Sequence, residues 1–128
     1  MATNDPITFS VKVTGIDSKE VFSGTFKTKT RLSHREQLKR GELRRSLLGE
    51  RPDTATPREL QQAEIFAEIM ISVIDAPSWW KNADGGLDLE DDNVVAEVYE
   101  GVLKARRERL EALKKEAEEA RAELKKGE

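Results

Sequence analysis

The last third of the chain contains almost nothing that would break a helix, and this feature constrains the fold more than any other. From Asp88 to Gly127 there is no proline, and Gly101 is the one glycine inside that stretch. Acidic residues at 88–92 suit the positive end of a helix dipole. The pattern predicts a helix of about 35 residues, roughly 50 Å long. We expect such a helix to project beyond the compact body of the chain.

This predicted helix has two parts of different composition. Its first part carries enough valine, tyrosine and leucine to pack on a core, whereas residues beyond Ala105 are almost all Arg, Lys, Glu, Ala or Leu. A sparse apolar seam continues there at alternating spacings of three and four, which is typical of a coiled coil. The seam consists of Leu103, Leu110, Leu113, Ala117, Ala120 and Leu124, with Arg106 filling one place. We expect residues 1–104 to form a compact body and residues 105–128 a charged extension, which either contacts another chain or stays solvated.

Two segments near the N-terminus predict a β-hairpin. Ile7, Phe9, Val11 and Val13 alternate with polar residues, which is the period of a half-buried strand. A second run places Phe22, Gly24 and Phe26 on one face, after a five-residue connection at 15–19. A two-stranded sheet leaves open edges, so either helices cover one face and the edges stay wet, or another chain adds a strand.

Two capping boxes predict the starts of two helices. Ser33 with Glu36 begins a helix that ends near Leu48, before Gly49. Thr56 with Glu59 begins a helix from Pro57 to about Asp75, whose broad apolar arc is typical of a central, buried helix. The expected fold is α+β, with an N-terminal hairpin packed on two capped helices and a long C-terminal helix. The expected core is Phe9, Val11, Phe22, Phe26, Leu43, Leu47, Ile65, Phe66, Ile69, Met70, Val73, Val95, Val98 and Val102.

The composition speaks against several classes of protein. The chain has no cysteine and one histidine, His34, so the residues of thiolate metal sites, disulfides and most acid–base pairs are missing. No nucleotide-binding or hydrolase motif occurs. We expect no enzyme activity, no catalytic residues, no metal and no cofactor. No apolar run approaches the ~20 residues of a membrane span, and residues 1–6 do not resemble a secretory signal, so we expect a cytoplasmic protein without membrane contact.

Trp79 and Trp80 are the first candidates for partner contact. Neighbouring tryptophans just after Pro77 cannot easily both point inward, so we expect one to cap the core and the other to be available as a docking anchor. In the C-terminal extension, the candidates are Leu110, Leu113 and Leu124.

The alternative surface is basic. Residues 27–51 contain nine basic and three acidic residues, a net charge of +6. A nucleic-acid-binding helix would use Arg35, Lys39, Arg40, Arg44 and Arg45. The helix carries no aromatic residue to stack on bases, however, and a solvated face or pairing with the acidic stretch at 84–100 explains the charges as well. This uneven charge also suits head-to-tail contact between copies.

Five short segments occur in a characteristic order along residues 7–104. They are Phe22-Ser23-Gly24-Thr25-Phe26-Lys27, Leu32-Ser33, Arg44-Arg45-Ser46-Leu47-Leu48-Gly49, Ala76-Pro77-Ser78-Trp79-Trp80 and Gly86-Leu87-Asp88-Leu89. In these segments the chain resembles the small tail-assembly chaperones and related accessory morphogenesis proteins of tailed bacteriophages. The resemblance leaves out the charged tail.

The resemblance implies a binding protein that acts during virion assembly in the host cytoplasm. Its partners would be tape-measure, tail-tube or capsid subunits, or further copies of the chain. Similar small phage proteins instead stay in the particle as minor capsid, decoration or connector components. The sequence leaves these two roles open.

Overall fold

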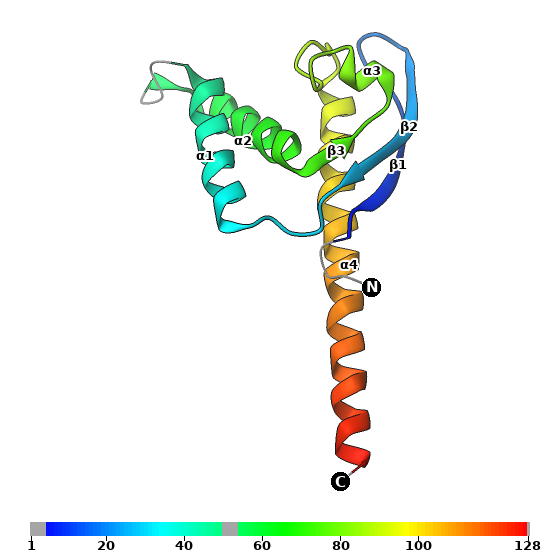
Figure 1. The fold of residues 1–128 in the computed structure, drawn as a ribbon. Coiled ribbons are helices and arrows are strands. Elements are labelled where there is room, and N and C mark those ends of the chain that lie inside the picture. The colour runs from blue at the N-terminus through cyan, green and yellow to red at the C-terminus, as the bar shows by residue number, and fades with distance from the viewer. Residues whose placement is uncertain (1–4, 50–53, 128) are drawn as a thin grey trace.

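The computed structural model describes residues 5–49 and 54–127 (Figure 1). In chain order, the elements are β1 (Ile7–Thr14), β2 (Val21–Thr28), α1 (His34–Leu48), α2 (Pro57–Ser72), β3 (Val73–Asp75), α3 (Ser78–Lys81) and α4 (Asp92–Lys126). The strands form one antiparallel sheet in the order β1-β2-β3. The predicted α+β class is confirmed, including the long final helix.

The hairpin has the predicted alternation. Phe9 pairs with Phe26 across the two strands, and their rings stack at a centroid distance of 5.2 Å. Val11, Phe22 and Phe26 are buried, while the residues directly before and after each of them are exposed. Because side chains alternate between faces along a strand, this register turns one apolar face of the hairpin toward the helices.

The central helix ends earlier than predicted, and the sheet gains a strand. The sequence predicted a helix up to about Asp75, but α2 stops at Ser72 and residues 73–75 pair with the end of β2. Val73 and Ile74 are β-branched and favour extended backbone. The carbonyl of Ser72 accepts from the backbone N–H of Lys29 at 2.9 Å and from the hydroxyl of Thr28 at 3.2 Å. These bonds to Thr28 and Lys29, at the end of β2 and just after it, replace the next helical turn.

Both predicted capping boxes are present. The side chain of Ser33 accepts from Glu36 N–H, the side chain of Thr56 accepts from Glu59 N–H, and each glutamate reaches back to its cap. Helix α1 packs against α2 and has no buried residue of its own. The prediction that Leu47 lies in the core is therefore wrong, because this side chain is 36% exposed at the open end of α1. Of the other predicted core positions, Val11, Phe22, Phe26, Ile69, Val95, Val98 and Val102 are buried, and Phe9, Leu43, Ile65, Phe66, Met70 and Val73 are half-buried.

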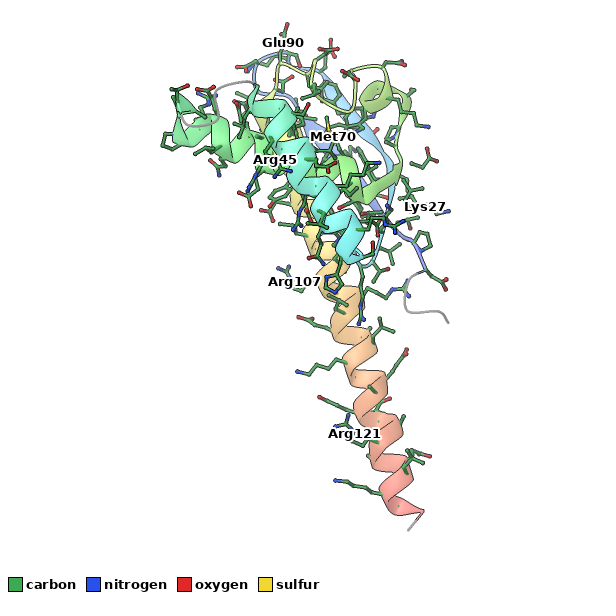
Figure 2. The ribbon with its side chains drawn as sticks, turned by 60° about the vertical axis from the view of Figure 1, so that its left-hand side comes forward. Lys27, Arg45, Met70, Glu90, Arg107 and Arg121 are labelled. Atoms are coloured by element: carbon green, nitrogen blue, oxygen red, sulfur yellow. The ribbon has the colours of Figure 1, made fainter. Side chains whose placement is uncertain are left out.

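Helix α4 is the longest element. Its first half packs against β1 and α2, with Val94, Val98 and Val102 fully enclosed. Gly101 provides a slot for the ring of Phe9, since a Cβ at this position would lie 2.4 Å from Phe9 Cε2. The second half runs well past every other element (Figures 1 and 2). The molecule thus consists of a head, formed by the described residues up to Arg106, and a projecting stalk, formed by residues 107–127.

Candidate protein-binding surfaces

The two tryptophans both pack inward, which corrects the expectation that one would point away. Trp80 is only 3% exposed, and its ring meets Phe26 edge-on at 5.6 Å. Trp79 is half-buried and lies against Phe22 and Phe26 at 5.1 and 5.7 Å. The short helix α3 turns the two rings almost perpendicular, at 87°, which lets both reach the same face of the sheet. Trp80 is therefore enclosed in this structure, and Trp79 keeps only a partial surface.

Two glycines make room for this packing. A Cβ at Gly24 would lie 2.3 Å from the Pro77 ring, and a Cβ at Gly86 would lie 2.3 Å from Trp80 Cη2. Gly86 also has φ of +87°, a conformation that strains other residues. The indole N–H of Trp79 donates to the carbonyl of Ser23 at 2.9 Å. The segment 76–80 is thus part of the core that covers the hairpin.

A buried charged network fastens α4 to the head. Arg106 donates to the carboxylate of Glu68 and the hydroxyl of Ser72, and its Nε donates to the carbonyl of Lys29 at 3.2 Å. Arg40 also contacts Glu68, at 2.6 Å. Burial of Glu68 raises the pKa of its carboxyl, but the bonds from Arg40 and Arg106 outweigh this effect and leave the pKa below its usual value. Arg106, which occupies a place in the predicted seam, therefore belongs to the head.

A second network holds the turn of the hairpin against the start of α4. Asp91 is buried and accepts from the N–H groups of Asp17 and Ser18 at 2.7 and 3.1 Å, and from the Ser18 hydroxyl at 2.6 Å. These bonds, with the Ser18 hydroxyl first, lower the pKa of the Asp91 carboxyl. Asn93 adds a bond to Ile16 N–H at 3.1 Å. Asp91, at the start of α4, thus stabilises the turn of the hairpin by accepting its hydrogen bonds.

Beyond Arg106, the seam of α4 lies outside the head. Leu110 is 39% exposed, Leu113 is half-buried and Leu124 is 75% exposed. Leu113 lies eleven positions after Val102, a rotation of about 1,100° around the helix, which is within about 20° of three full turns. The seam therefore continues the same face of α4 that packs on the head. The structure brings these three leucines together on one side of the stalk, far from the tryptophans.

The basic helix offers a different surface. Arg35, Lys39, Arg44 and Arg45 are exposed on α1, while Arg40 is engaged with Glu68. One of the five predicted phosphate contacts is thus already bound to a carboxylate. At the N-terminal end of α1, Glu36 pairs with Lys29, and this contact helps to lower the pKa of the Glu36 carboxyl to about 2.

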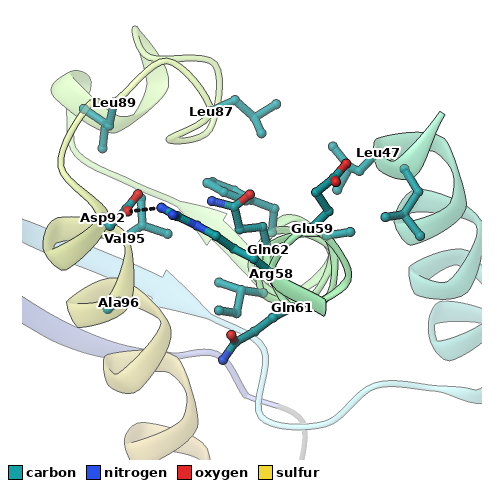
Figure 3. Close-up of a pocket in the computed structure, with 14 residues that line it drawn as sticks. Leu47, Arg58, Glu59, Gln61, Gln62, Leu87, Leu89, Asp92, Val95 and Ala96 are labelled. Carbon is teal, nitrogen blue, oxygen red and sulfur yellow. Dashed lines mark hydrogen bonds and ion pairs between the residues drawn. The ribbon is translucent and has the colours of Figure 1, made fainter. Parts of the chain in front are cut away.

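A hollow of about 540 Å³ is lined by residues of α1, α2, the loop before α4 and the start of α4, among them Leu48 and Phe66. Leu47 lies on one side of it, and Leu87 and Leu89 lie across from α1 and α2 (Figure 3). An exposed ion pair between Arg58 and Asp92, at 3.0 Å, crosses it. The walls suit contact with apolar side chains.

The sheet edges differ from the expectation of a bare hairpin. Part of the outer edge of β2 is taken by β3, so β1 and the short β3 are the edge strands. Ile74 on β3 is half exposed, beside a smaller hollow that Met70 and Trp80 help to line. Whether another chain adds a strand there stays a prediction.

Within residues 5–49 and 54–127, no group of acidic or histidine side chains is placed to hold a metal ion. In the same residues, no helix combines the length and apolarity needed to cross a membrane. No protein-family model, curated protein or solved structure matches this chain.

Proposed function

We propose that this protein works by binding other proteins during assembly of a phage virion, in the manner of a tail-assembly chaperone. The observation that carries the proposal is the stalk of α4, which extends past the head and presents Leu110, Leu113 and Leu124. Isolated helices are marginal in water, and leucines repeated at heptad spacing are typical of a helix that packs on another helix.

The phage context comes from the resemblance of residues 7–104 to tail-assembly chaperones. A chaperone of this kind coats a tape-measure protein or recruits tail-tube subunits. A minor structural component would use the same surface, but it would stay bound to its partner in the particle, whereas a chaperone would release its partner before assembly is complete.

Mass spectrometry of two samples would test the proposal: particles purified from the infected cells that the resemblance implies, and material that co-purifies with the tagged chain. Recovery only from the lysate, together with a long helical or tube-forming protein, supports the chaperone role. A fixed copy ratio in particles supports the structural alternative. Recovery without any specific protein partner contradicts both.

The basic helix supports a second candidate function, nucleic-acid binding, because Arg35, Lys39, Arg44 and Arg45 are exposed together on α1. This function predicts binding to duplex or single-stranded DNA that weakens steeply with salt. Absence of any binding at about 50 mM salt, where phosphate contacts are strong, would remove it.

A further inference from the structure

The direction of the seam restricts what can bind to it. Val98 and Val102 are fully buried on the head-facing side of α4, and Arg106 is clamped to the head on the same side. Leu113 and Leu124 lie 11 and 22 positions after Val102, close to whole numbers of helical turns, so they continue this side below the head. A partner helix must therefore lie directly beneath the head.

A second copy running parallel does not fit this position. In a parallel pair, equivalent residues face each other, so the partner's α4 would run upward along the face that Val98 and Val102 use. That space is already filled by β1 and α2 of the first copy. The head of each copy thus blocks a parallel pair.

An antiparallel second copy is disfavoured by charge. With Leu110, Ala117 and Leu124 at the first position of each heptad, one flank of the seam carries Arg107, Lys114 and Arg121, all exposed. In an antiparallel pair, this flank faces its own copy, and like charges at a contact oppose association.

The same flank attracts a helix of opposite charge. The flank with Arg107, Lys114 and Arg121 carries a positive charge at each position, whereas Glu116 and Glu123 lie on the other flank. We propose that residues 110–124 bind an amphipathic helix of a different protein, whose apolar stripe is bordered by acidic side chains facing Arg107, Lys114 and Arg121. This inference rests on the proposed protein-binding function and specifies the chemistry of the partner.

Two synthetic helices of about three heptads serve as probes, both with leucine at the seam positions. One has glutamate along a single flank of its leucine stripe, to face Arg107, Lys114 and Arg121, and the other has lysine along that flank. Both have glutamine along the second flank, so that neither peptide is repelled by or attracted to Glu116 and Glu123. The full chain should be monomeric by light scattering and should bind the acidic peptide about tenfold more tightly than the basic one, as measured by calorimetry or fluorescence anisotropy. The triple variant R107E/K114E/R121E should reverse this preference.

A pair of variants tests the face of the helix. Leu113→Glu should weaken binding of the acidic peptide at least tenfold, because it places a charge in the seam. Ala122→Glu is the matched control, since Ala122 is exposed on the opposite side of the stalk, and it should leave binding within about twofold.

The inference is overturned if the chain forms a dimer that Leu113→Glu abolishes, if neither peptide binds, or if both bind equally. It is also overturned if the triple variant keeps the original preference. A partner that co-purifies equally with wild type and Leu113→Glu would keep the proposed function and remove this inference. If the acidic peptide binds as expected but no cellular partner co-purifies with the chain, the inference about the stalk is kept and the proposed function is removed.

Discussion

Replacing Arg106 by methionine should destabilise the head. Methionine keeps most of the aliphatic stem but removes the guanidinium, which contacts Glu68, Ser72 and the carbonyl of Lys29. The side chains of Arg106 and Glu68 are only 13% and 10% exposed, so solvent does little to compensate for the loss. Removal of one partner from a buried ion pair costs about 3–5 kcal/mol.

The expected cost is at the low end of that range, about 3 kcal/mol, because Arg40 still pairs with Glu68. For a chain of this size, this corresponds to a fall of about 10 °C in melting temperature. The double variant Arg106→Met/Glu68→Gln should be less destabilised than the sum of the single variants, by about 1–2 kcal/mol, because both charges of the buried pair are then removed and only the partly exposed Arg40 loses its partner.

Urea unfolding followed by tryptophan fluorescence measures the free energy of unfolding of the head. Trp79 and Trp80 pack on the hairpin, and there is no tryptophan in α4, so the signal reports the head rather than the stalk. Arg107→Met is the control, because Arg107 is exposed and its replacement should change stability by no more than about 0.5 kcal/mol. If Arg106→Met unfolds at the same urea concentration as Arg107→Met, the buried network does not hold α4 to the head.

Two further predictions concern the loops around the start of α4. Gly86→Ala should cost about 2–4 kcal/mol in the same unfolding assay, because the added Cβ clashes with Trp80 and the backbone has a positive φ. Gly85→Ala is the control: it also has a positive φ but no atom within 4 Å of the added Cβ, so it should cost only about 1 kcal/mol. Equal losses in the two variants would contradict the packing of Trp80 on Gly86. Since the pKa of Asp91 is lowered by Ser18, its stabilising effect should be complete above the unfolded value of about 3.9 and disappear as the pH falls through the lower folded value. The stability gap between wild type and Asp91→Asn should therefore narrow below about pH 4, and a gap that stays constant would show that ionisation of Asp91 does not matter.

Local patterns predicted most elements because each has its own physical signature. The alternation around Phe9 and Phe26, the two capping boxes and the helix up to Gly127 were all evident in short windows. Strand β3 was missed because it depends on pairing with β2, a contact between distant segments. The β-branched pair Val73-Ile74 before Pro77 was the one local signal for it.

The candidate surfaces were harder to predict, because burial depends on the tertiary arrangement. The sequence could not show that α3 turns Trp79 and Trp80 toward one face, nor that Arg106 turns to the head instead of a partner. A charged residue within an apolar seam is ambiguous: it borders a contact between chains or forms a buried pair within one. The distinction required Glu68, 38 residues earlier in the chain.

The place where the head ends along α4 can be tested by two truncations. A chain that ends at Arg109 keeps the Arg106 network, so its head should unfold within about 0.5 kcal/mol of the full chain, although circular dichroism should show less helix. A chain that ends at Lys104 loses Arg106 and should be destabilised by at least about 3 kcal/mol, as in Arg106→Met. Equal destabilisation of both truncated chains would mean that residues 110–127 support the head, and the stalk would then be no independent binding surface. A stable head in both would mean that the apolar contacts up to Val102 suffice, and that the Arg106 network fixes the direction of the stalk without adding stability.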